Sequence, residues 1–209
     1  MSVAAALRTG AALAAAAAVG GCSSLFSGGE ATPTFFVWQD AGKSAPAPAA
    51  LPRTLVVAPT ATATFYDTQR IAFSQASGTR AYYQLAAWTE RPGKRFDVLL
   101  LDRLLARNAF AAIAATTSGT RGDLVLAASI DDVYHDNARQ PGVARLRITV
   151  ELADRSGRVL LARRTLVEEA PLAEENAAAA VTAFDAAVAR VLDALVPWLE
   201  REAAKAGAS

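Results

Sequence analysis

The clearest structural signal in the chain is an alternation of apolar and polar residues between positions 143 and 152. In VARLRITVEL the apolar residues fall at every second position, with arginine, threonine and glutamate between them. A period of two predicts a strand with one face on a core and the other in solvent. DLVLAASIDDVYH precedes this strand across a turn at Pro141-Gly142, and RVLLARRTLV follows it across a turn at 154–157. We therefore predict an antiparallel three-stranded meander.

Two other segments carry apolar residues at the helical spacing of three and four. Between about 94 and 109, leucines recur at positions 100, 101, 104 and 105, with Asp and Arg between them. In the C-terminal segment, one stripe is formed by Val181, Phe184, Val188, Val191, Leu192, Leu195 and Leu199. Both patterns predict amphipathic helices. Pro197 is expected to kink the second helix and to leave its last turn loosely held.

Shorter apolar runs precede the first helix and predict the remaining strands. TFFVWQD at 34–40 and RTLVVAP at 53–59 each predict one strand. QRIAFSQ and TRAYYQLAAW, separated by residues 76–79, predict a two-stranded hairpin. The order of strands, helix, meander and closing helix predicts a single α+β domain, with a mainly antiparallel sheet covered on one face by the two amphipathic helices.

Composition and charge narrow the class of protein. Hydrophobic residues make up 53% of the 209 residues and charged residues 20%, which fits a globular chain that can bury a core. The chain has 21 Lys and Arg and 20 Asp and Glu, and Arg8 is the one charged residue before Cys22, so 20 of each sign follow. This balance argues against nucleic acid as a partner, because phosphate binding needs a cationic surface. A single cysteine allows neither an internal disulfide nor a thiolate cluster for a metal.

The N-terminal residues have the pattern of a bacterial lipoprotein signal. Arg8 is followed by the apolar run AALAAAAAV at 11–19, which has the length of an export signal and is too short to span a bilayer. Val19-Gly20-Gly21-Cys22 then resembles a lipobox, in which the leader is cut before a cysteine that takes up diacylglycerol. The alternative is a secreted protein with an incidental cysteine. Acyl chains such as palmitate would anchor the chain, since each buried methylene contributes about 0.8 kcal/mol.

These patterns divide the chain into four parts. We expect a signal peptide at 1–21, then a lipidated N-terminus and flexible tether at 22–52 with a first strand near 34–39, a folded domain at 53–200, and a loose tail at 201–209. SSLFSGGEATP and AGKSAPAPAALP are rich in Ser, Gly, Ala and Pro, which is typical of flexible or extended linkers. Ser23, rather than aspartate, follows the cysteine, which favours a lipid anchor in the outer membrane and a domain facing the periplasm.

Few residues have the pattern of a catalytic, nucleotide or metal site. GKS at 42–44 ends like a phosphate-binding loop, but Val37 stands where the motif needs glycine, and prolines follow. His135 is the single histidine, and a metal site would combine it with Asp131 and Asp136. Alternation along a strand puts Asp136 on the other face, so we predict a solvated strand end. We expect no catalytic residue, no bound metal and no cofactor.

Two acidic pairs, Glu168-Glu169 and Glu174-Glu175, are predicted to lie where a helix begins, because the helix dipole favours negative charge there. They are therefore interpreted as capping residues and not as an acid–base pair.

Four residues, Tyr82, Tyr83, Trp88 and Arg91, form a candidate interaction surface. Alternation predicts that Tyr82 and Tyr83 lie on opposite faces of the sheet, one in the core and one exposed. An exposed tyrosine near Trp88 would suit an interface, where aromatic residues and arginine are enriched. Packing within the core is the alternative for these residues, and the same choice applies to Trp198.

Residues 65–92, FYDTQRIAFSQASGTRAYYQLAAWTERP, resemble the signature of the ABC-type transport auxiliary lipoproteins, the PqiC-like family. The signature residues are Tyr66, Asp67, Arg70, Tyr82, Trp88 and Glu90. The resemblance extends over nearly the whole mature chain, from the lipobox through the aromatic pair Phe35-Phe36 and LVVAP to the first amphipathic helix. The chain departs from the family in having Phe35-Phe36-Val37-Trp38 where a tyrosine pair and leucine are common.

The resemblance implies an accessory subunit of an MCE-type lipid transport system in the periplasm. Its partners would be an ABC permease, an ATPase and an MCE-domain protein that moves lipid between the inner and outer membranes, and identical copies could assemble into a homo-oligomer such as a ring. Two hypotheses follow: a docking or assembly subunit, or a lipid-binding carrier with an apolar cavity of roughly a few hundred Å³ between sheet and helices. The alanine and medium-sized aliphatic residues of the helices pack closely, which favours docking.

Overall fold

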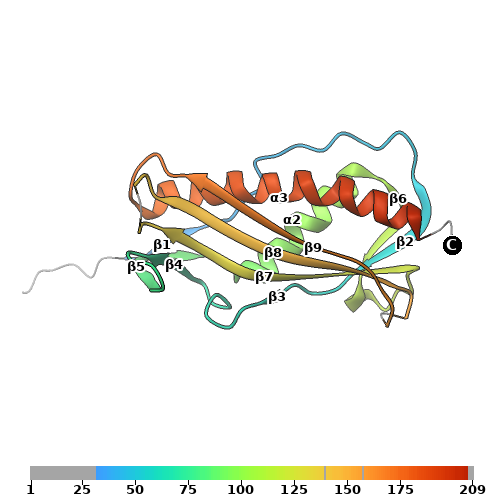
Figure 1. Ribbon diagram of the computed structural model, residues 1–209, viewed down its shortest axis with the longest axis horizontal. Coiled ribbons are helices and arrows are strands. Elements are labelled where there is room, and N and C mark those ends of the chain that lie inside the picture. Colours follow the sequence, from blue (N-terminus) through green and yellow to red (C-terminus); the bar gives the residue numbers. More distant parts are fainter. Residues whose placement is uncertain (1–31, 139, 157, 207–209) are drawn as a thin grey trace, which may run out of the picture. The chain divides into compact units, whose positions relative to one another are not determined.

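A long central strand, β7 (Leu124–Asp136), organises the sheet of the computed structural model, which describes residues 32–138, 140–156 and 158–206 (Figure 1). Along one edge β7 pairs with β8 (Val143–Asp154), and β8 pairs with β9 (Leu160–Pro171), both antiparallel. The predicted meander is confirmed. The alternating apolar residues of β8, such as Ile148 and Val150, are fully buried, so one face of the meander lies on the core.

The other edge of β7 is shared by three short strands that follow one another along it. The remaining strands are β1 (Thr34–Phe36), β2 (Leu51–Val57), β3 (Ala61–Thr62), β4 (Arg70–Ser74), β5 (Ala81–Trp88) and β6 (Phe110–Ala115). β2, β3 and β4 all run parallel to β7, while β6 extends the sheet beside β2, and β5 and β1 extend it beside β4. The predicted hairpin of β4 and β5 is antiparallel.

The sheet is therefore mixed, and the prediction of a mainly antiparallel sheet is wrong in this respect. β1 pairs with β5 in parallel, as β6 does with β2. A 13-residue strand has an edge of about 43 Å, which is long enough for three short strands to pair with it one after another. β3 and β6 were not predicted.

Two helices complete the α+β domain: α2 (Pro92–Arg107) and α3 (Ala177–Lys205), with a short 3-10 turn, η1 (Thr116–Ser118), between β6 and β7. Pro92 starts α2, where its missing N–H is not needed, and Asn108 ends it in the left-handed conformation (φ 51°). Asn176 caps α3 by accepting a hydrogen bond from the N–H of Ala179 (2.9 Å). α3 packs along β8 and β9, and α2 contacts β3, β6 and β7 (Figure 1).

Helix α3 continues through Pro197 to Lys205, which corrects the prediction of a loosely held end. Trp198 and Ala203, both beyond the proline, are buried, so Trp198 belongs to the core. Proline cannot donate the helical hydrogen bond at its position. In the preceding turn, however, Arg164 on β9 donates to the carbonyl of Ala194 (3.2 Å), and the apolar stripe packs on the sheet on both sides of the break.

The segment between β1 and β2 has no regular structure, yet it is held against the helices. Trp38 is 2% exposed. Asp40 accepts two hydrogen bonds from the buried Arg103 (2.7 and 2.5 Å), and Ala47 donates its N–H to the carbonyl of Arg107 (2.7 Å). From Pro33 onward the chain belongs to one folded unit. The expected tether thus reaches at most to about residue 32, because Trp38 and Asp40 bind the segment that follows to the core.

Candidate interaction surface

Aromatic and charged side chains gather around the loop between β3 and β4. We call this group the loop surface: Phe65, Asp67, Arg70, Tyr82 and Arg91. The rings of Phe65 and Tyr82 stack at 4.5 Å with an interplanar angle of 7°. The Arg70 guanidinium lies 4.2 Å from the centre of the Tyr82 ring on β5. Arg91, just before α2, binds the Asp67 carboxylate at 3.2 Å. The loop surface therefore joins two strands, a loop and a helix start.

A partly buried polar network supports the loop surface from the sheet. Tyr66 donates its hydroxyl to Asp132 on β7 (3.1 Å) and accepts a hydrogen bond from Arg80 (2.9 Å). The Arg80 guanidinium lies 3.5 Å from the centre of the Tyr134 ring, and the rings of Tyr66 and Tyr134 are stacked. Burial raises the pKa of Tyr66, so its hydroxyl remains a hydrogen-bond donor at neutral pH. The network fixes the backbone from which Phe65 and Asp67 project.

The structure separates the four residues of the predicted interaction surface. Tyr82 and Arg91 both belong to the loop surface and are linked through Phe65 and Asp67, since the Tyr82 hydroxyl donates to the carbonyl of Phe65 (2.6 Å). Trp88 is a core residue, packed against Trp38 and Phe184. Tyr83 contacts a different set of residues, described below. Cys22 lies outside the described residues.

A second network, buried under the end of the sheet, centres on His135. This side chain is 1% exposed, so the prediction of a solvated strand end is wrong. Its Nδ1 accepts a hydrogen bond from the Tyr83 hydroxyl (2.6 Å), and its Nε2 donates to Glu175 (3.1 Å). Glu175 also accepts the N–H of Gly142 (2.8 Å). This pattern fits a neutral imidazole, and it joins β5, β7, the β7–β8 turn and the segment before α3.

Tyr83, His135 and Glu175 form a relay of three hydrogen-bonded polar side chains. Burial raises the pKa of Tyr83 to about 12, and Glu175 adds to the effect. The phenolate needed for nucleophilic attack is therefore disfavoured at neutral pH. At Gly142 a side chain would bring its Cβ within 2.6 Å of both His135 and Glu175, so the turn must approach the relay as glycine. The relay pins the turn to the start of α3.

We expect the stability of the protein to fall as the pH drops below about 6.5, through His135. Burial lowers the pKa of His135 below its ordinary value of 6.5, and the nearby Glu175 offsets part of this. Between the two pKa values the unfolded chain binds the proton and the folded chain does not, so acid favours unfolding. The stability is fully present above the unfolded pKa. The free energy of unfolding, measured by urea titration from pH 8 to pH 5, should show this slope.

The His135→Gln variant is the control for this pH dependence. Burial raises the pKa of Asp185 to about 6, despite opposing effects of the Gln39 N–H and Arg95, and this carboxyl stabilises the folded chain as the pH falls. Because Asp185 is present in both chains, its effect cancels in the difference between wild type and variant. A wild-type chain that loses no more stability on acidification than His135→Gln would contradict the assignment.

One of the two acidic pairs lies elsewhere than predicted, and the other precedes α3 as predicted. Glu168 and Glu169 belong to β9, not to a helix start, and bind Arg190 and Arg145. Glu174 does precede α3, where it accepts a hydrogen bond from the Asn176 side chain (2.7 Å). Within the described residues, no three His, Cys, Asp or Glu side chains gather as a metal site. No helix in the described part of the chain is both long enough and apolar enough to cross a bilayer.

Comparison with known proteins identifies the family. The model of the ABC-type transport auxiliary lipoprotein component matches residues 38–196, which include every element from β2 to the middle of α3. The chain belongs to this family. No curated protein matches the auxiliary lipoprotein. The family match begins at Trp38, the first core residue after β1, and contains the whole loop surface.

Solved structures share the fold of the auxiliary lipoprotein. A protein from Xanthomonas campestris, XCC0632, assigned to the DUF330 family, is 22% identical over 84% of this chain and 100% of its own, with a TM-score of 0.76. An uncharacterized protein is 11% identical over 80% of this chain and 99% of its own, with a TM-score of 0.63. The hypothetical protein CT253 from Chlamydia trachomatis is 10% identical over 72% and 96%, with a TM-score of 0.50.

Sequence reasoning found Tyr82 and Arg91 but missed Phe65, Arg80 and Tyr134 as their neighbours. Phe65 stands directly before the signature Tyr66-Asp67, and its place in an FYD triplet was the available signal. Arg80 reaches its partners across the sheet, 52 residues away from Asp132 in the chain. Such a contact depends on which strands pair, and no local pattern reports it.

Proposed function

We propose that this protein is an accessory lipoprotein of an MCE-type ABC transport system that moves lipid between the inner and outer membranes. In this proposal Cys22 carries the acyl chains, the anchor is in the outer membrane, and residues 33–206 face the periplasm. The role is that of a docking or assembly subunit and not of a catalyst. The observation that carries the proposal is the family match over residues 38–196, which names an auxiliary component of ABC-type transport.

The packing of the core supports docking over lipid carriage. The space between the sheet and the helices is filled by side chains such as Leu146, Phe184 and Leu195, all fully buried. Three depressions of the described region, with volumes of about 570 to 710 Å³, open at the surface and are lined by loop residues and by outer faces of α2 and α3. A carrier needs an enclosed apolar site for acyl chains. A surface that binds protein partners needs no such cavity.

The loop surface is the proposed contact with the transporter. It presents two stacked aromatic rings together with the side chains of Arg70, at the start of β4, and Arg91, just before α2, which is the composition of interface hot spots. Its backbone is already held by the Tyr66 network, so little conformational entropy is lost when a partner binds. Self-association is also part of the proposal, since β9 pairs with β8 alone among the described strands and leaves one edge for another chain.

Phe65→Ala is expected to weaken docking by roughly five- to thirtyfold, because exposed aromatic anchors contribute about 1–2 kcal/mol to binding. A photo-crosslinking residue placed next to it, at Thr64, should join the chain to an MCE-domain protein or permease in intact cells. Mass spectrometry of the crosslinked band identifies the partner. Leu105→Ala, at a residue of α2 that is 58% exposed, is the control, and it should leave the yield of the crosslinked product unchanged. Equal yields from Phe65→Ala and wild type would remove the loop surface from the proposal.

A further inference from the structure

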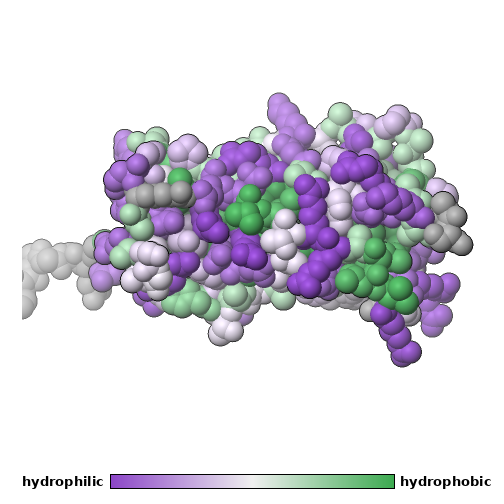
Figure 2. Space-filling view, in the orientation of Figure 1, coloured by the Kyte–Doolittle hydropathy of each residue, from purple (hydrophilic) through white to green (hydrophobic). Residues whose placement is uncertain are grey.

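The turn between β8 and β9 ends in three consecutive exposed aliphatic residues. Val159, Leu160 and Leu161 are 56%, 53% and 40% exposed. The pairing of β8 and β9 shifts here, since Leu152 pairs with Ala162 and Ala153 with Leu160, and Leu161 is the extra residue at this irregularity. The three aliphatic side chains therefore lie at an irregular, uncovered end of the hairpin. Figure 2 shows a hydrophobic area over this end of β9, next to hydrophilic side chains that project beyond it. We call residues 155, 156 and 158–161 the hairpin tip.

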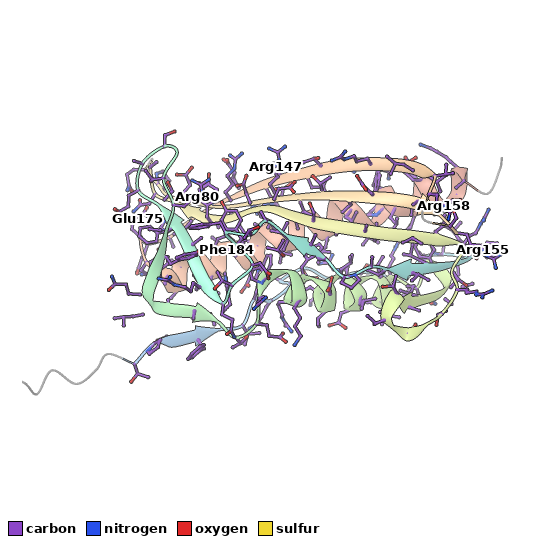
Figure 3. The ribbon with its side chains drawn as sticks, turned by 90° about the horizontal axis from the view of Figure 1, so that it is seen from below. Arg80, Arg147, Arg155, Arg158, Glu175 and Phe184 are labelled. Carbon is purple, nitrogen blue, oxygen red and sulfur yellow. The ribbon has the colours of Figure 1, made fainter. Side chains whose placement is uncertain are left out.

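Three arginines at or beside the hairpin tip have no acidic partner among the residues that the structure describes. Arg155 and Arg158 belong to the tip, at the opposite end of the sheet from Arg80 and Glu175 (Figure 3), and Arg121 precedes β7. Within the part of the chain that the structure describes, their guanidinium groups make no hydrogen bond or ion pair. Many of the other surface arginines are paired: the guanidinium groups of Arg80, Arg91, Arg107, Arg145, Arg163 and Arg190 each lie by a carboxylate.

The carboxylate of Asp154, which directly precedes Arg155 in the chain, is used by the turn itself. It accepts hydrogen bonds from the N–H groups of Arg158 (3.1 Å) and Val159 (3.0 Å) and from the Ser156 hydroxyl (2.9 Å). These bonds, first of all the one from the Val159 N–H, lower the pKa of Asp154. The carboxylate therefore shapes the turn, and Figure 3 shows Arg155 and Arg158 at this end of the sheet.

A depression lies beside the hairpin tip. It has a volume of about 710 Å³, and its polar lining consists of Arg121, Arg155, the hydroxyl-bearing Thr116, Thr120 and Ser156, and Asp154, whose carboxylate is bound by the turn. Guanidinium and hydroxyl groups are donors that suit phosphate oxygens. Next to it, the aliphatic residues offer an apolar surface that no protein layer covers. The two halves of an amphiphile are thus matched by neighbouring parts of one surface.

We propose that the hairpin tip binds the surface of an anionic phospholipid bilayer, with Arg121, Arg155 and Arg158 at the phosphates and Val159 to Leu161 in the interface. A bilayer places phosphate groups directly over an apolar layer, which is the order of charges and aliphatic residues at the tip. An acidic protein would match the arginines but would leave three aliphatic side chains in water. This contact goes beyond the proposed function, because it is a second attachment to lipid, independent of the acyl anchor and of the transporter.

The test uses the chain from Ser23 to Ser209, which has no acyl chains and keeps all the described core residues. This chain should sediment with vesicles of phosphatidylglycerol and phosphatidylethanolamine, and not with vesicles of phosphatidylcholine. Each of Arg155→Ala and Arg158→Ala should lower the affinity about fivefold, the effect of one basic residue at an anionic surface. Leu160→Asp should lower it about tenfold or more. Added salt should weaken binding, because it screens the phosphates.

Two matched controls separate a local contact from general charge or hydrophobicity. Arg163→Ala removes an arginine that is already bound to Glu151 on the same hairpin, and Leu105→Asp changes an equally exposed leucine on α2. Neither should alter vesicle affinity. Equal binding to phosphatidylcholine, or equal losses in the controls, would overturn the proposal. Binding to native membranes but not to protein-free vesicles would also overturn it, by assigning the tip to a protein. Any of these results leaves the crosslinking test of the loop surface unaffected.

Discussion

The Phe184→Ala variant is expected to lose about 3–5 kcal/mol of the free energy of unfolding, the usual cost of removing a buried phenylalanine. Phe184 on α3 is fully buried and packs edge-on against two tryptophans, Trp38 at 6.5 Å and Trp88 at 5.7 Å between ring centres. The three rings join the segment after β1, the end of β5 and the long helix. Alanine would leave a cavity bounded by two rigid indoles that cannot collapse into it. Urea denaturation measures the loss.

The matched control for this cavity is Phe35→Ala, the same change at a residue that is 59% exposed on β1. Its effect should lie within about 0.5 kcal/mol of zero. Trp38→Ala provides a second comparison, because it removes another ring of the same aromatic cluster. Trp38 belongs to the stretch 22–52, for which the sequence predicts a tether with a first strand. If Trp38→Ala cost no more than Phe35→Ala, residues 37–50 would not be part of the folded unit.

Replacement of Cys22 by serine is expected to remove the chain from the outer-membrane fraction. A hydroxyl cannot form the thioether to diacylglycerol, and the acyl methylenes, each worth about 0.8 kcal/mol of membrane binding, would be lost. Separation of the two membranes and immunoblotting of each fraction measures the change. Ser23→Ala keeps the thiol and should behave as wild type. Cofractionation of Cys22→Ser with the outer membrane in wild-type amount would refute acylation as the anchor.

The regular elements could be predicted because their patterns are local. The alternation in β8 and the leucines of α2 report burial of one face, and both elements lie within two residues of the predicted ranges. The parallel strands could not be assigned in this way. β2, β3 and β4 are short, and each pairs with β7, which lies tens of residues further along the chain. The edge that each strand joins therefore depends on the length of β7 and not on its own local pattern.

The candidate site shows the same limit at the level of single residues. Tyr82 and Tyr83 were assigned to opposite faces of a regular strand, with one exposed. The pairing of β4 and β5 shifts between Arg70 and Ala72, so both tyrosines are half-buried and each finds its own partners. His135 was predicted to be solvated because it lies at the end of a predicted strand, where alternation places Asp136 on the other face. Its burial depends on Tyr83 and Glu175, which lie 52 and 40 residues away in the chain.

The most direct test of a membrane-attached auxiliary subunit is the mass of the N-terminal peptide of the protein isolated from its own membranes. We predict a chain that begins at residue 22 and carries diacylglycerol on the cysteine sulfur, with a further acyl chain on its amine. A peptide that still contains residues 1–21 and an unmodified thiol would contradict the lipid anchor, the outer-membrane address and the proposed role together.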